Sequence, residues 1–321
     1  MTRKPILIVA GEPYSIFSEI FFKSLKKLNL KRPLVLIASK KIFLQQMKKL
    51  GYNYQFNTID KKLSKEIFYK QKVINIIDVE FKFIKIFDKI SNKSNEYISE
   101  CFLIANNLLK NNKAYALING PISKKNFLKD KYLGVTEYLS GMNNVRNFAM
   151  LIYNKSLSVS PITTHIALKK VSSKISKKRI INHVYLIKKF YYSLFKKNVK
   201  IAITGLNPHC ESNFKDSEEK KVISPAISFL KKKGYKVEGP FPTDSLFMKN
   251  NINNFDVVVG MYHDQVLTPM KTIHNFEAIN ITLGLPYIRI SPDHGTNNQM
   301  LGKNKSNPTS LISAIKFLQI K

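Results

Sequence analysis

Short runs of aliphatic and β-branched residues alternate along this chain with longer segments whose apolar residues recur at helical spacing. The strand candidates lie at 5–10, 34–38, 114–118, 148–153, 199–204, 257–260 and 278–282. The helix candidates lie at 18–29, 40–50, 95–110, 178–196, 216–233 and 308–319. This alternation is typical of an α/β fold with a largely parallel sheet. Open sheets of this kind bind ligands at the carboxyl ends of their strands, so the turns that follow the strands are the places to search.

The 216–233 helix carries signals at both of its ends. Asp216 and Glu219 have the spacing of a capping box, and Gly234 directly follows the last helical residue. The segment 57–93, by contrast, shows no clear period and contains many lysines. We therefore expect 57–93 to form an irregular excursion on the surface.

The chain is strongly basic, with 53 Lys and Arg against 21 Asp and Glu and a formal net charge of +32. Such an excess suggests a nucleic-acid partner. Only five of the 53 cations are arginines, although phosphate and base-edge recognition favour Arg. We therefore expect a solvated lysine-rich surface and no specific nucleic-acid partner. A basic nucleic-acid-binding protein stays the alternative from another function class, and it predicts tight binding with a steep salt dependence.

The cysteine content and the apolar runs bear on the compartment. Cys101 and Cys210 cannot build a disulfide framework, which indicates a reducing environment. The apolar run 6–10 is too short for the core of a signal peptide. No apolar run approaches the roughly 20 residues that a membrane-spanning helix needs. We expect a cytoplasmic protein without a membrane partner.

Three histidines, His165, His209 and His263, each follow an apolar run or its turn. Imidazole is a common ligand of divalent transition metals, and three protein ligands with one open position form a catalytic zinc site. No local spacing such as H-E-x-x-H brings these histidines together, so each of them could equally be a turn or cap residue. His183 lies within a helix candidate, where we expect a partly buried side chain, and His274 lies in a polar turn.

Several carboxylates lie beside these histidines or in similar turns. Asp264 directly follows His263 and could ligate a metal, orient an imidazole, bind a substrate amine or cap a helix. Asp244 is also a plausible helix cap. Asp293 and His294 could form an acid/base pair, although the glycine that follows them equally allows a tight turn.

Lys271 and Arg289 are candidate anchors for an anion. Arg289 is a rare arginine that directly follows an apolar strand candidate, and a bound phosphate or carboxylate would explain why lysine has not replaced it. A structural ion pair would explain it as well. The sequence contains neither G-x-G-x-x-G nor G-x-x-x-x-G-K-[ST], which removes the usual dinucleotide fingerprint and the P-loop.

Several of these polar segments match motifs of one enzyme family. The longest matches are MYHDQ at 261–265, NITLGLP at 280–286 and RISPDHGT at 289–296. Shorter matches are GEP at 11–13, GPI at 120–122, TEY at 136–138, LNPH at 206–209, and GP at 239–240 with Asp244 and Phe247. By their order and number, from about residue 6 to residue 315, the chain resembles the 4-hydroxythreonine-4-phosphate dehydrogenase family of vitamin B6 biosynthesis.

The resemblance implies the fold of the isocitrate and isopropylmalate dehydrogenases. That fold has two α/β/α subdomains with the active cleft between them, here as one two-lobed unit over 1–321. The cleft would be lined by segments near 134–138, 163–165, 205–209, 260–271 and 280–296. Enzymes of this fold bind NAD without G-x-G-x-x-G, which agrees with its absence here.

The resemblance also implies a reaction. NAD or NADP would oxidise 4-phosphooxy-L-threonine to 2-amino-3-oxo-4-phosphobutanoate, which decarboxylates to 3-amino-2-oxopropyl phosphate. A divalent metal, zinc, magnesium or cobalt, would take part. The small phosphorylated amino acid would bind at the interface of a homodimer.

Roles carry over to the matching positions. The metal ligands would be His165, His209 and His263, one of them supplied across the dimer interface. Substrate would be bound by Thr136, Lys271, Asn280, Arg289 and Asp244. Lys271 and Asp264 are both candidates for the general base. The cofactor would contact Asp293, His294, Gly295 and Thr296.

Two departures from the family pattern bear on the substrate, and a third bears on the cofactor contacts. Val135 replaces a histidine that contacts substrate in the family, and the family's GDPAGIGPE becomes GEPYSIFSE at 11–19. Asn297 replaces the alanine of DHGTA. Val135 favours a sister dehydrogenase that acts on another phosphorylated hydroxy acid, such as a phosphothreonate. A relative that keeps the fold without the activity is the further alternative, against which the three retained histidines argue.

Overall fold

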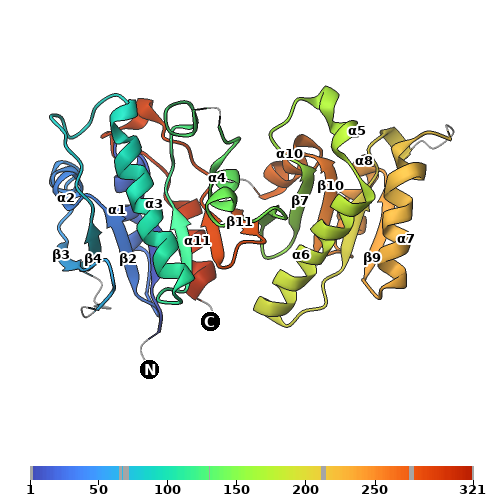
Figure 1. Cartoon of the computed structure of the whole chain (residues 1–321), viewed down its shortest axis with the longest axis horizontal. Helices are drawn as coiled ribbons and strands as arrows, with labels where there is room; N and C mark the ends of the chain where they lie inside the picture. Colours follow the sequence, from blue (N-terminus) through green and yellow to red (C-terminus); the bar gives the residue numbers. More distant parts are fainter. Residues whose placement is uncertain are drawn as a thin grey trace. The chain divides into compact units, whose positions relative to one another are not determined.

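The computed structural model describes residues 3–64, 67, 72–129, 131–210, 215–274 and 278–319. The chain divides into two compact units, one formed by 1–139 with 286–321 and the other by 140–285. In Figure 1 the C-terminal segment, coloured red, lies with the N-terminal blue and cyan elements of the first unit. The chain therefore leaves the first unit once and returns to it.

The sheet of the first unit is parallel throughout. Its strand order is β3–β4–β2–β1–β5–β12. The strands are β1 (Ile6–Val9), β2 (Leu34–Ala38), β3 (Gln55–Ile59), β4 (Val73–Asp78), β5 (Ala116–Asn119) and β12 (Ile288–Ser291). Every residue of β1, β2 and β5 is buried, because a parallel sheet is covered by helices on both faces.

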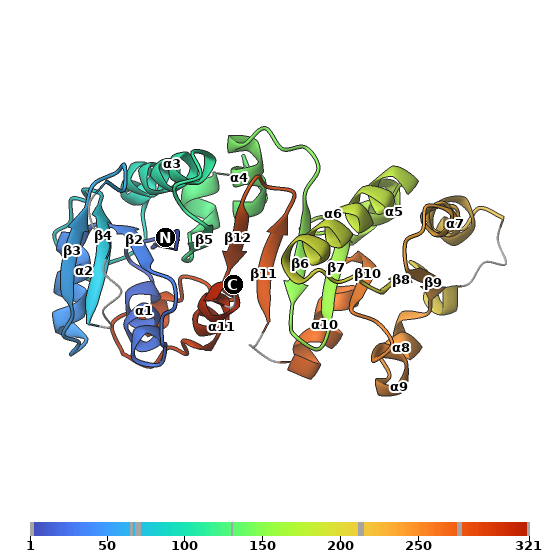
Figure 2. The same cartoon turned by 90° about the horizontal axis from the view of Figure 1, so that it is seen from below.

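Helices cover both faces of this sheet (Figure 2). They are α1 (Phe17–Lys26), α2 (Lys40–Lys49), α3 (Asn95–Lys110), α4 (Val135–Met142) and α11 (Thr309–Gln319). Figure 2 shows α3 on one face, with α1 and α11 on the other. Aromatic side chains join α1 to α2: the rings of Phe22 and Phe43 lie 5.4 Å apart between their centroids, edge to face.

The sheet of the second unit is mixed, in the order β11–β6–β7–β10–β8–β9. The strands are β6 (Ala149–Tyr153), β7 (Ser158–Thr163), β8 (Ile201–Thr204), β9 (Val237–Phe241), β10 (Val257–Tyr262) and β11 (Ile279–Leu283). β6 runs antiparallel to both β11 and β7, whereas β7, β10, β8 and β9 are parallel to one another. The carboxyl ends of these four parallel strands lie at one edge of the sheet.

The helices of the second unit also lie on both faces (Figure 2). They are α5 (Val171–Lys174), α6 (Lys177–Phe195), α7 (Ser224–Lys232), α8 (Thr243–Leu246), α9 (Lys249–Ile252) and α10 (His263–His274). Short 3₁₀ or π-helical turns occur at Asn92–Ser94, Lys124–Leu128, Leu168–Lys170, Pro208–Cys210, Glu219–Ile223 and Asn298–Met300. Within the described ranges, no helix is long and apolar enough to cross a membrane.

The expected α/β class is confirmed, and so are the expected strands and helices, most of them with small shifts of their ends. The helix expected over 216–233 is a π-helical turn at Glu219–Ile223 followed by α7 from Ser224. The prediction for 57–93 is wrong in its main point, because β4 lies inside the sheet between β3 and β2. Ile74, Ile76 and Ile77 of β4 are buried, and the lysines that obscured this short apolar run lie outside the strand. Residues 65–66 and 68–71 of that segment lie outside the described residues.

The predicted capping box is also wrong. Asp216 is exposed and pairs with Lys221, while the carboxylate of Glu219 turns away to bind the backbone at 206–207. Ser217 takes the capping role, because its hydroxyl accepts the Lys220 N–H at 3.3 Å. The predicted helix stop is confirmed, since α7 ends at Lys232 and Gly234 has a φ of +75°.

Candidate functional site

The three candidate metal histidines all follow adjacent parallel strands of the second unit. His165 lies two residues after β7, His263 directly after β10, and His209 in the turn after β8. The register pairs Tyr262 with Thr163, so the ends of β7 and β10 are level. The ring centroids of His165 and His263 lie 5.7 Å apart. Sheet register thus joins two histidines that are far apart in the sequence.

Each of two histidines has a carboxylate neighbour. The Nδ1 of His263 lies 2.7 Å from Oδ1 of Asp264, in the first turn of α10. The Nδ1 of His209 lies 3.9 Å from Oδ2 of Asp244, in the first turn of α8. The Asp264 contact is a hydrogen bond, so it fixes the tautomer of His263 and leaves the other ring nitrogen free to bind a metal, whereas the Asp244 contact is longer than a hydrogen bond.

The geometry fits a divalent metal in part. His165 and His263 lie close enough for both imidazoles to bind one ion. A zinc–nitrogen bond to histidine is about 2.1 Å long. The part of the chain that the structure describes contains no group of three His, Cys, Asp or Glu side chains close enough to hold a metal. His209 is therefore not joined to the other two within one chain. That a second copy supplies the third ligand stays a prediction.

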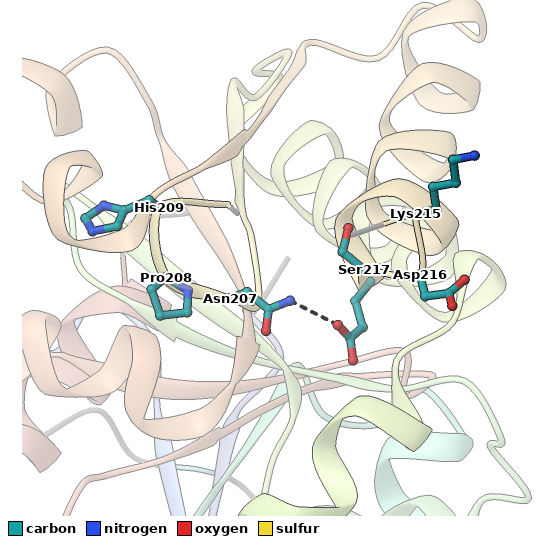
Figure 3. Close-up of a pocket in the computed structure, with 7 residues that line it drawn as sticks. Asn207, Pro208, His209, Lys215, Asp216 and Ser217 are labelled. Carbon is teal, nitrogen blue, oxygen red and sulfur yellow. Dashed lines mark hydrogen bonds between the residues drawn. The ribbon is translucent and has the colours of Figure 1, made fainter. Parts of the chain in front are cut away.

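The loop that carries His209 borders a pocket of about 690 Å³ (Figure 3). One side is formed by Asn207, Pro208 and His209, and the other by residues 215–218. Figure 3 shows the His209 ring directed away from Lys215 and Ser217. Residues 211–214, between the two sides, lie outside the described residues.

The backbone of this loop is strained at the histidine. His209 and the following Cys210 have φ values of 54° and 55°, in the left-handed region that residues other than glycine seldom adopt. Such strain persists only where the surroundings hold it, and it is commonest at functional sites.

Glu219 holds the start of the same loop. Its Oε1 accepts the N–H groups of Leu206 at 2.7 Å and Asn207 at 2.9 Å, and its Oε2 accepts the Asn207 amide at 2.9 Å. Burial raises the pKa of Glu219, but the hydrogen bonds from Asn207 and Leu206 outweigh it and leave the pKa below its usual value. Glu219 is therefore an ionised carboxylate that fixes the backbone before His209.

Gln265 also holds the backbone near the histidines, and the sequence analysis named it only as part of a motif. Its amide forms hydrogen bonds with Thr204 and Gly205 at the end of β8, with Met261 in β10 and with Thr243 in α8. The only available signal was its place at the end of the MYHDQ motif. Neither its partners nor their number could be deduced without the fold.

Two further candidates lie on the second unit. Lys271 is exposed in the last turn of α10. Asn280 lies in β11, where its Nδ2 is 3.4 Å from the sulfur of Met150. Its Oδ1 is buried and has no hydrogen-bond partner within the described residues, so it can accept a hydrogen bond from a ligand.

Arg289 lies on the first unit, and its expected position is corrected. It is part of β12 rather than following a strand, and it is 2% exposed. Its Nε donates to Oδ1 of Asn119 at 2.8 Å, and its Nη1 donates to Oγ1 of Thr136 at 3.1 Å. Burial lowers the pKa of Arg289 to about 10, which still leaves the guanidinium charged at neutral pH. Asn119, at the end of β5, was missed by the sequence analysis.

The candidate cofactor segment 293–296 follows β12. The Asp293 N–H donates to Oγ of Ser310 at 2.6 Å, and the Thr296 carbonyl accepts the Ile16 N–H at 3.2 Å. Both ring nitrogens of His294 are buried without a hydrogen-bond partner within the described ranges. Burial lowers the pKa of His294 to about 4, so the ring is neutral. Orphaned ring nitrogens fit a ligand that supplies hydrogen bonds, as a nucleotide does.

The two remaining histidines have structural surroundings. His183 is buried in α6, as expected, with Nε2 2.7 Å from Oγ of Ser160, and burial lowers its pKa to about 3. His274 ends α10, with Nε2 3.4 Å from Oγ of Ser156. Neither belongs to the group formed by His165 and His263.

Comparison with known proteins agrees with the motifs. The chain is 37% identical over 320 residues to 4-hydroxythreonine-4-phosphate dehydrogenase of Sulfurihydrogenibium sp., covering 97% of this chain and 96% of that protein. It is 29% identical to D-threonate 4-phosphate dehydrogenase of Pectobacterium atrosepticum, covering 98% of each. The crystal structure of 4-hydroxythreonine-4-phosphate dehydrogenase from Klebsiella pneumoniae superposes with a TM-score of 0.86, at 28% identity and 98% coverage of each chain.

More distant similarity supports the expected fold type. Isocitrate dehydrogenase from Methylococcus capsulatus matches with a TM-score of 0.50 at 11% identity, covering 99% of this chain and 85% of that one. The sequence model of the family described as pyridoxal phosphate biosynthetic protein PdxA matches residues 29–318. By this match and the full-length identity, the chain belongs to the PdxA family.

Proposed function

We propose that this protein is a dehydrogenase that oxidises 4-hydroxythreonine-4-phosphate with NAD or NADP and a divalent metal. The observation that carries the proposal is the His165–His263 pair at the level ends of β7 and β10, in a chain 37% identical to a 4-hydroxythreonine-4-phosphate dehydrogenase. The pathway is that of vitamin B6, as the family description implies.

The metal would be held by His165 and His263 of one chain and by His209 of a second copy in a homodimer. Asp264 keeps His263 in the tautomer that presents Nε2, through the 2.7 Å contact with Nδ1. A bound divalent cation supplies Lewis-acid polarisation of the substrate hydroxyl. Zinc, magnesium and cobalt are the candidates.

Substrate binding is assigned to the charged and amide groups at the positions that match the family. Arg289, with Thr136 beside it, offers charge-assisted hydrogen bonds to a phosphate or carboxylate. Lys271 and Asn280 are the matching donors and acceptors on the second unit. Because Asp264 already contacts His263, Lys271 is the better of the two candidates for the general base.

The nicotinamide cofactor is assigned to the segment 293–296. There the neutral His294 ring has two buried nitrogens without a hydrogen-bond partner among the described residues, and a bound cofactor could supply one. A nicotinamide cofactor held there would accept the hydride from the substrate carbon that bears the hydroxyl group, and the product would be 2-amino-3-oxo-4-phosphobutanoate. This β-keto acid loses carbon dioxide and gives 3-amino-2-oxopropyl phosphate.

A second substrate is favoured by one specific feature. Val135, the first residue of α4, stands directly before Thr136 and offers no hydrogen bond where the family has histidine. A relative 29% identical over nearly the whole chain is a D-threonate 4-phosphate dehydrogenase. D-threonate 4-phosphate is therefore the alternative substrate.

The test is reduction of NAD and of NADP with each of the two phosphorylated acids. Each assay is run with a chelator and after zinc, cobalt or magnesium is added back. Chelator-sensitive turnover of 4-hydroxythreonine-4-phosphate, at a higher kcat/KM than D-threonate 4-phosphate, supports the proposal. The reverse preference supports the alternative, and turnover that the chelator leaves intact refutes the metal assignment.

A further inference from the structure

The side-chain amide of Gln265 has a hydrogen-bond partner for each of its four bonding positions. Its Oε1 accepts the Met261 N–H at 2.7 Å and the Thr204 hydroxyl at 3.0 Å. Its Nε2 donates to the Gly205 carbonyl at 2.8 Å and to the Thr243 hydroxyl at 3.0 Å. A neutral amide has two N–H donors and two acceptor lone pairs, so these bonds use its whole capacity.

One of these four hydrogen bonds, that from Met261, leads to the histidine pair. Met261 precedes His263 by two residues, and its N–H is held by Gln265. Its carbonyl accepts the hydroxyl of Thr163 at 2.7 Å, and Thr163 precedes His165 by two residues. The peptide groups of Met261 therefore connect Gln265 to the ends of both β10 and β7.

The other three lead to the end of β8 at Thr204, to the His209 loop and to the carboxylate neighbour of His209. Gly205 begins the turn that leads to His209, and its carbonyl accepts from Gln265. Thr243 directly precedes Asp244, whose carboxylate lies 3.9 Å from the His209 ring. One side chain thus joins the three strand ends that carry the candidate ligands and the helix that carries Asp244.

Glycines leave the room that this arrangement needs. A Cβ at Gly260 would lie 2.4 Å from Cγ1 of Val266 and 3.1 Å from Oε1 of Gln265. A Cβ at Gly205 would lie 2.6 Å from Sγ of Cys210. The backbone approaches Gln265 and the His209 loop so closely that any larger residue would displace them.

We infer that Gln265 is a positioning residue, which sets the spacing of the loops that carry His165, His209 and His263 and thereby the affinity of the site for a divalent cation. The inference rests on the proposed function, because that function makes these histidines metal ligands. It adds a role that the amide plays without contacting metal, cofactor or substrate.

The sharpest variant is Gln265→Glu. It keeps an oxygen for Met261 and Thr204, but it places a second oxygen 2.8 Å from the Gly205 carbonyl, where the amide had an N–H. The hydroxyl of Thr243 can rotate to donate, so the link to the His209 loop is the one that is lost. Supporting partners of metal ligands typically contribute about 10–100-fold in affinity, so we expect Co²⁺ to bind at least tenfold more weakly.

The matched control is Gln319→Glu in α11 of the first unit. Gln319 is also buried, and its amide accepts from the N–H groups of Lys31 and Arg32 and donates to the Arg32 carbonyl. Gln319→Glu likewise removes an N–H donor from a buried hydrogen bond to a backbone carbonyl, that of Arg32. None of the partners of Gln319 is a candidate site residue. We expect a lower thermal stability and an unchanged affinity for Co²⁺.

Co²⁺ affinity is measured by titration of the metal-free full-length protein, followed by visible absorption. Wild-type affinity in Gln265→Glu, or an equal loss in Gln319→Glu, overturns the inference. If Gln265→Glu does not fold, Thr243→Val removes a single partner of the amide. A loss of affinity of about two- to fivefold then supports the inference, and unchanged affinity overturns it.

Ring signals of the histidines in NMR spectra of the metal-free proteins separate this inference from the proposed function. We expect Gln265→Glu to shift the signals of His209 and His263 and to leave that of His183 in place. If the wild type binds no Co²⁺, the metal assignment fails, and these shifts alone then decide the role of Gln265. Absence of any shift overturns it.

Discussion

Arg289 in the first unit and the histidines of the second unit are held in different ways. Arg289 is part of β12, is 2% exposed, and is fixed by Asn119 at the end of β5 and Thr136 at the start of α4. The histidines lie beyond the ends of strands: the side chain of His209 is 76% exposed, and its backbone is strained. Regular elements on both sides position the guanidinium, whereas His165 and His209 lie in turns after strands and His263 is the first residue of α10.

The difference shows which of the two proposed sites, the anion site at Arg289 or the metal site at the histidines, is complete within one chain. In its proposed role as an anion anchor, Arg289 is already held by two hydrogen bonds, so little conformational entropy would be lost on binding. The imidazole pair lacks a third ligand within the described part of the chain. In the proposed site a second copy supplies that ligand, and Gln265 and Glu219 hold the backbone segments that carry the histidines.

The largest expected effect tests whether the third ligand comes from a second copy. His209→Ala and His263→Ala should each lower turnover by about 10³-fold or more, because each removes one of three proposed ligands. An equal mixture of the two variants, allowed to exchange subunits, should recover about a quarter of wild-type activity. Half of the dimers are then mixed, and each mixed dimer contains one intact site.

Steady-state assays of the separate and mixed variants measure this recovery. His274→Ala, at the other end of α10 from His263, is the control and should keep wild-type turnover. Activity that stays absent after proven subunit exchange would show that His209 acts within its own chain.

Substitution of the buried arginine should have the next largest effect. Arg289→Lys keeps a positive charge but loses the planar fork that donates to Asn119 and Thr136. We expect kcat/KM to fall about 10–100-fold, mainly through KM, because a charge-assisted hydrogen bond contributes about 1.5–3 kcal/mol. Arg146→Lys, at an exposed position, should leave both constants unchanged, and an unaltered KM in Arg289→Lys would refute its role as an anchor.

Glu219 offers a test of the loop by pH. Because its pKa is lowered in the folded protein, its carboxylate contributes stability above the unfolded pKa of about 4.3, and this contribution is lost as the pH falls through the folded value. Glu219→Gln should therefore lower the free energy of unfolding by about 1–3 kcal/mol at pH 7. The difference from wild type should shrink below about pH 4.

Urea unfolding of both proteins at pH 7, 5, 4 and 3 measures this difference. Glu218→Gln is the comparison on the neighbouring residue. The Glu218 carboxylate accepts hydrogen bonds from the Ser172 hydroxyl and the Asn207 side-chain amide. The backbone N–H groups of Leu206 and Asn207 donate to Glu219 instead. A stability difference for Glu219→Gln that does not depend on pH would contradict the proposed ionised state.

The smallest expected effect concerns the half-buried Val135. Val135→His restores a hydrogen-bonding ring beside Thr136 at the start of α4. We expect kcat/KM for 4-hydroxythreonine-4-phosphate to rise about two- to tenfold, as one additional neutral hydrogen bond allows. Competition between the two phosphorylated substrates measures the change in preference. A lower value for both substrates would show that valine is adapted to the present pocket.

The sequence predicted the elements best where a strand is apolar along its whole length. β1 and β2 are buried on both faces, so their runs of Ile, Leu and Val are unambiguous. β4 and β12 were missed because polar residues interrupt their apolar runs, Asn75 in β4 and Arg289 in β12. A polar side chain can enter a central strand when the fold supplies its partners, and those partners are distant in sequence.

Sequence by itself determined the α/β class, the family and the identity of the candidate residues, because these depend on local periodicity and on the order of short motifs. Only the tertiary structure decided which candidates meet. The pairing of β7 with β10 places His165 beside His263. The Glu219 carboxylate binds the backbone N–H groups of the turn at 206–207 instead of capping the helix, as its spacing predicted. Hydrogen-bond partners far apart in the chain are fixed by strand register and packing, which local sequence does not encode.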